Sequence, residues 1–83
     1  MRKTAVVILK LHGRKEEVDL EIPLDITARD LIYALNEAYN LEMDLQNIRN
    51  FYLRTERPIA LLHGNKTLEE YHIRNGSVIH ITE

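Results

Sequence analysis

Hydrophobic and polar residues alternate along residues 4–22 in a pattern that predicts two strands. In TAVVILKL, residues 4–11, Lys10 interrupts a β-branched and aliphatic run and shows which side chains face inward. After the polar turn HGRKE around Gly13, the run EVDLEI, residues 17–22, alternates strictly. Because the link between the two strands is short, we expect a hairpin. Its predicted inward residues are Ala5, Val7, Leu9, Leu11, Val18, Leu20 and Ile22.

The next segment has helical spacing. Thr27 suits the position that caps a helix N-terminus, and Asp30 three residues later resembles a capping box, which normally uses Glu or Gln. Asn40 can adopt the left-handed conformation that ends a helix. Hydrophobic residues recur every three or four positions between these ends, which predicts a helix from Ala28 to Asn40. The predicted core-facing stripe is Ala28, Leu31, Ile32, Leu35, Ala38 and Tyr39.

The second half of the chain predicts three more strands, at residues 47–54, 59–62 and 77–82. Pro58 lies between the first two and cannot donate to a ladder. TLEEY, residues 67–71, predicts a single helical turn, and Asn75-Gly76 reverses the chain before the last strand, whose inward residues are Ile79 and Ile81.

The order of these elements predicts one α+β domain over residues 1–83. We expect a mixed sheet of four to five strands with one helix packed across one face. The first and last strands should lie parallel in its centre, because the most apolar strands belong there. This is the β-grasp arrangement.

Composition limits the classes of function. The chain has 11 basic and 13 acidic side chains among 83 residues, so its charge gives no reason to expect nucleic acid or an anionic membrane as partner. No run approaches the roughly 20 apolar residues of a membrane span. We therefore expect a soluble cytoplasmic protein that does not insert into a membrane.

No catalytic, cofactor-binding or metal-binding site is predicted. The absence of cysteine excludes thiolate metal sites and a nucleophilic thiol. Ser77 has no evident base partner, and the three glycines form no phosphate loop. The spacing of the four histidines matches no metal motif, and they are expected in turns and on an exposed strand face. They are His12, His63, His72 and His80.

Two longer runs resemble ubiquitin-like proteins. VDLEIPLDITARDLIYAL is similar to their passage from second strand to helix, and TLEEYHIRNGSVIHI is similar to their ending. Within that superfamily, DLEIP, LIYALNEAYNL, IALL and the end at the last strand resemble the EsaB/YukD family of type VII (WXG100/ESX) secretion systems. The resemblance implies a cytosolic accessory or regulatory protein without enzymatic activity. Its implied partners are the cytosolic domains of membrane components of that machinery.

Two other functions stay open at this point. One is a β-grasp accessory subunit of a multicomponent enzyme such as an oxygenase. The other is a ubiquitin-like modifier or sulfur carrier. Conjugation and sulfur carriage both need a flexible C-terminal Gly-Gly. Only Thr82 and Glu83 follow the last inward isoleucine, so we expect no conjugation.

Strand parity predicts a partner-binding surface. If the first, third and last strands are neighbours, their outward side chains gather on the open face of the sheet, where a contiguous hydrophobic patch often marks a protein contact. This is the face that ubiquitin uses, and His80 matches its histidine there. A homodimer through this face fits equally well. The predicted surface consists of Val6, Ile8, Tyr52, Val78 and His80.

A second candidate surface is acidic. Glu17, Asp19 and Glu21 occupy alternate outward positions of the second strand, which should be a sheet edge. Charges at an edge discourage unwanted pairing, and the alternative function is a docking ridge for a basic partner.

Overall fold

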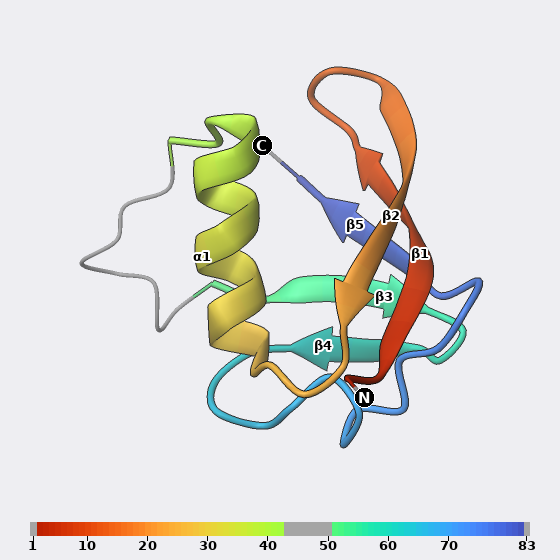
Figure 1. Cartoon of the computed structure of the whole chain (residues 1–83). Coiled ribbons are helices and arrows are strands. Elements are labelled where there is room, and N and C mark those ends of the chain that lie inside the picture. The colour runs from red at the N-terminus through yellow and green to blue at the C-terminus, as the bar shows by residue number, and fades with distance from the viewer. Residues whose placement is uncertain (1, 43–50, 83) are drawn as a thin grey trace.

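The alternating run at the start of the chain forms the predicted hairpin, and one helix lies across the sheet that the hairpin begins (Figure 1). The computed structural model describes residues 2–42 and 51–82. Within them the elements are β1 (Thr4–Leu11), β2 (Glu16–Pro23), α1 (Ala28–Tyr39), β3 (Leu53–Glu56), β4 (Ala60–Leu62) and β5 (Val78–Ile81).

The strands form one mixed sheet in the order β2-β1-β5-β3-β4. β1 and β5 are parallel, whereas β1–β2, β3–β5 and β3–β4 are antiparallel. This confirms the prediction that the first and last strands lie parallel inside the sheet. The turn before β5 is bound to β1, since the Val6 N–H donates to Asn75 Oδ1 at 2.7 Å and the Gly76 N–H donates to the Val6 carbonyl at 2.9 Å. Gly76 takes a φ of 88°, which suits a residue without a side chain.

α1 begins and ends as its sequence predicts. Thr27 Oγ1 accepts the Asp30 N–H at 3.1 Å, and Asp30 Oδ2 accepts the Thr27 N–H at 3.1 Å, so the capping box is complete with aspartate in place of glutamate. Asn40 is left-handed, with a φ of 51°. The predicted stripe is confirmed except at Ala38, which is exposed because at helical spacing it lies at the margin of the stripe.

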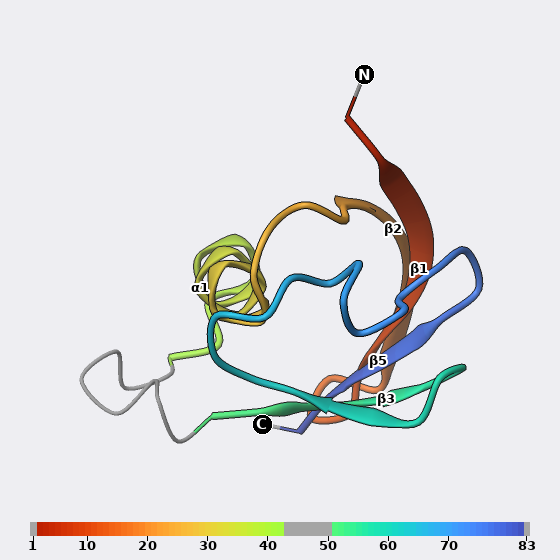
Figure 2. The same ribbon diagram turned by 90° about the horizontal axis from the view of Figure 1, so that it is seen from below.

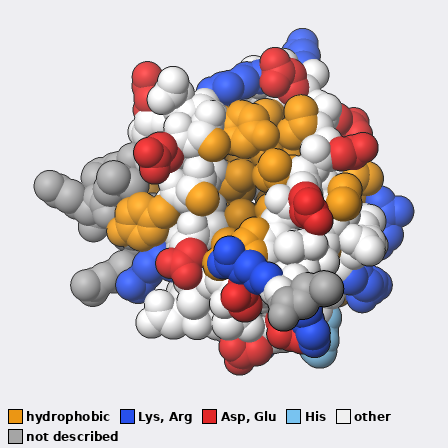
Figure 3. Space-filling view, viewed as in Figure 1, with side chains coloured by type: hydrophobic (Ala, Val, Ile, Leu, Met, Phe, Trp, Pro, Cys, Tyr) orange, Lys and Arg blue, Asp and Glu red, His pale blue; other side chains and the backbone are white. Residues whose placement is uncertain are grey.

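The core lies between α1 and the inner face of the sheet (Figure 2). Every predicted inward residue of β1 is buried, and so are Ile79 and Ile81 of β5. On β2 only Ile22 is fully buried, while Val18 and Leu20 are partly buried against the core. Among the described residues, β2 is an edge strand with a neighbour on one side only, which leaves these two side chains less covered. Figure 3 shows hydrophobic side chains gathered between α1 and β2.

The third predicted strand is placed differently. Of residues 47–54, positions 47–50 lie outside the described residues, and Phe51 and Tyr52 precede the strand, which runs from Leu53 to Glu56. It extends past the predicted end because pairing with β5 continues to Glu56. The chain then turns at Arg57, whose φ is 57°. Residues 67–71 contain the predicted single turn, in which the Tyr71 N–H donates to the Thr67 carbonyl at 3.1 Å.

Candidate protein-interaction surface

The face of the sheet that points away from α1 carries the predicted partner-binding residues. Strand register places Ile8 beside Val78, and Val78 beside Glu56. One step along, Lys10 lies beside His80, and His80 beside Arg54. The predicted neighbourhood of β1, β5 and β3 is therefore confirmed, and hydrophobic and charged side chains lie next to one another on this face.

The five predicted surface residues differ in exposure. Tyr52 is 60% exposed and Val6 46%, and Ile8 is partly buried. Val78 and His80 are only 2% and 8% exposed, so the expectation that these two residues are exposed is wrong. β5 lies between β1 and β3, and the longer side chains of those two strands flank it on both sides. The surface that a partner can touch is therefore displaced from β5 toward Val6 on one side and Tyr52 on the other.

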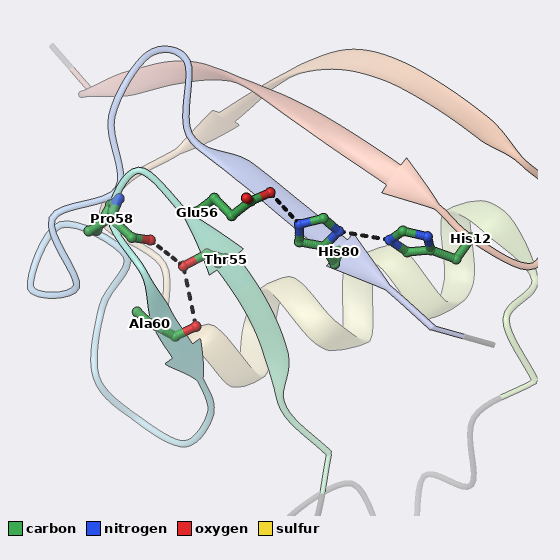
Figure 4. A network of polar contacts seen from close by, with 6 residues as sticks. All are labelled: His12, Thr55, Glu56, Pro58, Ala60 and His80. Atoms are coloured by element: carbon green, nitrogen blue, oxygen red, sulfur yellow. Dashed lines mark hydrogen bonds and ion pairs between the residues drawn. The ribbon is translucent and has the colours of Figure 1, made fainter.

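His80 joins three segments of the chain (Figure 4). Its Nδ1 lies 2.7 Å from Nε2 of His12, which follows β1, and its Nε2 lies 2.7 Å from Oε2 of Glu56 on β3. The planes of the two imidazole rings lie 17° from parallel, and their centroids are 5.0 Å apart. With both rings neutral, the tautomers that satisfy both contacts have His12 Nε2–H donating to His80 and His80 Nε2–H donating to Glu56. His80 is thus a structural link between β5, β3 and the β1–β2 turn.

The contact with His80 lowers the pKa of Glu56. The hydrogen bond from His80 holds the pKa of the Glu56 carboxyl below its usual value, with further lowering by nearby positive charge that includes Lys10 and Arg57. Partial desolvation opposes the shift. The Glu56 carboxylate is therefore favoured in its charged form in the folded protein.

The structure also shows the surroundings of the residues that the sequence analysis considered for metal binding and nucleophilic chemistry. Among residues 2–42 and 51–82, no cluster of three or more His, Cys, Asp or Glu side chains is arranged to hold a metal ion. Ser77 is fully buried, and its hydroxyl donates to the Arg57 carbonyl at 2.5 Å and accepts the Arg74 N–H at 3.0 Å. Its role is to bind the β3–β4 turn to the segment before β5.

Sequence reasoning missed two exposed hydrophobic residues at the β4 side of the sheet. Leu61 is 50% exposed, and Ile59 in the β3–β4 turn is exposed almost completely. The alternation within IALL contained the signal, because a strand that buries Leu62 must turn Leu61 to the opposite face. Register places Leu61 beside Arg54.

A hollow of about 280 Å³ opens on this side of the open face. It is lined by Tyr52, Arg54, Leu61, His80 and Thr82. It offers one aromatic and one aliphatic wall with a guanidinium and an imidazole beside them, which suits an apolar side chain of a protein partner. A larger hollow of about 630 Å³ lies on α1, and its mostly amide and carboxylate lining suits solvent better. That lining is Tyr33, Asn36, Glu37, Asn40 and Glu42.

The acidic residues of β2 lie where the sequence predicts. Glu17, Asp19 and Glu21 are all exposed, and β2 is an edge of the sheet. They lie opposite Lys10, Ile8 and Val6 of β1, respectively. Only the first of the three thus has a basic residue directly across the strand pair.

No helix in the described ranges, 2–42 and 51–82, combines the length and the hydrophobicity needed to cross a bilayer. Whether the protein is cytoplasmic stays a prediction.

The fold is that of a ubiquitin-like β-grasp domain, as the sequence predicts. The ubiquitin-like domain of a tubulin-binding cofactor B superposes with a TM-score of 0.72 at 13% identity, covering 96% of this chain and 89% of that chain. Tubulin-binding cofactor B of Trypanosoma brucei gives 0.68 at 18%, covering 94% and 92%. The ubiquitin-like domain of Dsk2 from Plasmodium falciparum gives 0.60 at 20%, covering 96% and 100%. At these identities the likeness shows the fold alone.

The family model described as "WXG100 protein secretion system (Wss), protein YukD" matches residues 6–81. The chain belongs to this family, and it is a ubiquitin-like protein of a WXG100 secretion system. The family predicted from its sequence is therefore confirmed. A search of the curated proteins found no match.

Proposed function

We propose that this protein is a cytosolic accessory or regulatory component of the WXG100 secretion system, and that it acts by binding a protein rather than by catalysis. The family match over residues 6–81 carries the proposal, because it assigns the chain to the secretion machinery rather than to an oxygenase-type complex. Ubiquitin-like domains generally work through protein–protein contacts, which agrees with this mode of action.

The proposed contact surface is the open face of the sheet around Tyr52 and Leu61. Both side chains are at least half exposed, and they line the same hollow with Arg54. Val6 extends the exposed hydrophobic area on the far side of β5. Val78 and His80 support this surface from below, since both are buried. The proposed partner is the cytosolic domain of a membrane component of the secretion system, with an apolar residue that enters the hollow and acidic groups near Arg54 and Lys10.

The test is co-purification of the secretion system's membrane components with the tagged protein from its own cells. Tyr52→Ala/Leu61→Ala should reduce their recovery at least tenfold and lower the secretion of small WXG100 substrates. Loss of aromatic and aliphatic anchors at the centre of an interface typically has effects of this size. Tyr33→Ala removes another exposed tyrosine, on α1 and away from the sheet, and should change neither measurement.

Unchanged recovery and secretion in the double variant would overturn the assignment of this face. A homodimer would overturn the choice of partner. It would appear as a dimer in sedimentation equilibrium that the double variant converts to a monomer without any effect on the membrane components.

A further inference from the structure

The outer edge of β2 is a second surface of the molecule, distinct from the open face. β2 is eight residues long and, in the part of the chain that the structure describes, pairs only with β1. At the usual rise of a strand this edge is roughly 26 Å long. A free edge of this length presents backbone groups that can pair with another strand.

The register shows which backbone groups are available at this edge. On β1 the Ile8 and His12 N–H groups donate to residues of the β5 segment, and the Val6 carbonyl accepts from Gly76. Even-numbered residues of β1 therefore bond toward β5, and odd-numbered residues bond toward β2. On β2, Leu20 and Val18 are the register partners of Val7 and Leu9, so their backbone groups bond to β1. The backbone groups directed away from the sheet are consequently those of Glu17, Asp19 and Glu21.

The two faces beside this edge differ in chemistry. On the open face, the side chains of Glu17, Asp19 and Glu21 are exposed, and none of them forms an ion pair within the described ranges. On the helix side, Val18 and Leu20 are partly buried, and hydrophobic side chains are visible between α1 and β2 (Figure 3).

The hydrophobic strip between α1 and β2 is bounded at both ends. At the β1–β2 turn, the Arg14 guanidinium donates to the Tyr39 carbonyl at the end of α1. At the other end, Arg2 Nε binds Asp25 Oδ1 at 2.9 Å in the connection that leads to α1. Between these two contacts, hydrophobic side chains are visible at the surface beside β2 (Figure 3).

We propose that the free edge of β2 binds an extended segment of a partner protein in which Lys or Arg alternates with aliphatic residues. In paired strands, side chains that lie directly opposite one another share a face. The basic residues of such a segment would lie opposite Glu17, Asp19 and Glu21. Its aliphatic residues would point to the helix side and cover Val18 and Leu20. The acidic side chains thereby select the partner, and the backbone groups between them supply the pairing.

The test uses the ¹⁵N-labelled protein with three acetylated and amidated eight-residue peptides. One alternates lysine and valine, one alternates glutamate and valine, and one has the first peptide's composition in two blocks. The alternating lysine peptide should slow amide hydrogen exchange at Glu17, Asp19 and Glu21 at least tenfold. Such protection requires backbone pairing, so charge attraction alone does not produce it. The other two peptides should leave these amides unprotected.

Two variants and their controls complete the experiment. Asp19→Lys/Glu21→Lys should weaken binding of the alternating lysine peptide at least tenfold, whereas Glu37→Lys/Glu42→Lys, with the same change in net charge elsewhere, should not. Asp19→Pro should abolish the protection, while Asp19→Asn should retain most of it. Proline removes only an N–H that points away from β1, so the hairpin is preserved.

Equal protection by the block peptide, or unchanged exchange with the alternating lysine peptide, would overturn the proposal. Tyr52→Ala/Leu61→Ala should bind the peptide normally, which separates this edge from the open face. The proposal for the β2 edge is therefore tested independently of the proposal for the open face.

Discussion

At the scale of single residues, His80 shows how a side chain on the open face of a sheet becomes structural. It lies on the strand between β1 and β3, and it contacts His12 and Glu56 at 2.7 Å each. A histidine whose two ring nitrogens are both occupied is poorly placed to bind a partner. Its contribution is to bind three segments together, and the charge of Glu56 makes that contribution dependent on pH.

Glu56→Gln should therefore reduce the free energy of unfolding at neutral pH, and the difference from the native chain should vanish in acid. The folded-state pKa of Glu56 lies below its ordinary value of 4.5 because His80 donates to the carboxylate. Its stabilisation is thus fully present above pH 4.5 and is lost as pH falls through the lowered pKa. Urea unfolding at a series of pH values measures this effect. Glu37→Gln on the exposed side of α1 is the control, and a pH-independent difference for Glu56→Gln would contradict the argument.

At the scale of elements, hydrogen bonds at both ends of α1 set where the helix begins and ends. The reciprocal hydrogen bonds of Thr27 and Asp30 satisfy two N–H groups that otherwise lack partners in the first turn. The left-handed Asn40 ends the helix, and the Leu41 N–H donates back to the Asn36 carbonyl at 3.2 Å. The helix also depends on packing, since a 12-residue helix alone is marginal in water.

Thr27→Ala should lower the free energy of unfolding by about 1 kcal/mol, the usual cost of losing a capping hydroxyl. Thr27→Ser keeps the hydroxyl and should recover most of that loss. Urea denaturation followed by far-UV circular dichroism measures both variants. Equal destabilisation by alanine and serine would show that the threonine methyl group, rather than the cap, stabilises the helix.

At the scale of the whole molecule, the parallel pairing of β1 and β5 connects the two ends of the chain through the core. Leu9 and Ile79 are register partners in this pair, and both are fully buried. β1 also carries Val6, which is 46% exposed on the opposite face of the sheet. β1 thus contributes core residues on one face and a residue of the proposed interaction surface on the other.

Leu9→Ala should cost about 2–5 kcal/mol, because it removes buried methyl groups and leaves a cavity. Val6→Ala should change stability by less than about 0.5 kcal/mol, since nearly half of the residue stays exposed in the folded protein. Thermal unfolding separates the two, because about 1 kcal/mol corresponds to roughly 4–8 °C in a domain of this size. A comparable loss in both variants would contradict the assignment of the two faces.

The elements with local signals could be predicted from the amino-acid sequence alone. The inward residues of β1, the capping box of α1 and the turn at Asn75-Gly76 all follow from side chains within a few positions of one another, and each is confirmed. The topology followed from the same patterns, because the most hydrophobic strands must lie inside a sheet that has one covered face.

Which residues of the open face reach solvent depends on contacts between distant parts of the chain. His80 is buried by contacts with His12, 68 positions away, and Glu56, 24 positions away, and no local pattern contains that information. The late start of β3 depends likewise on pairing between strands. Alternation assigns a side chain to a face, but its exposure depends on the lengths of the side chains that neighbouring strands place beside it.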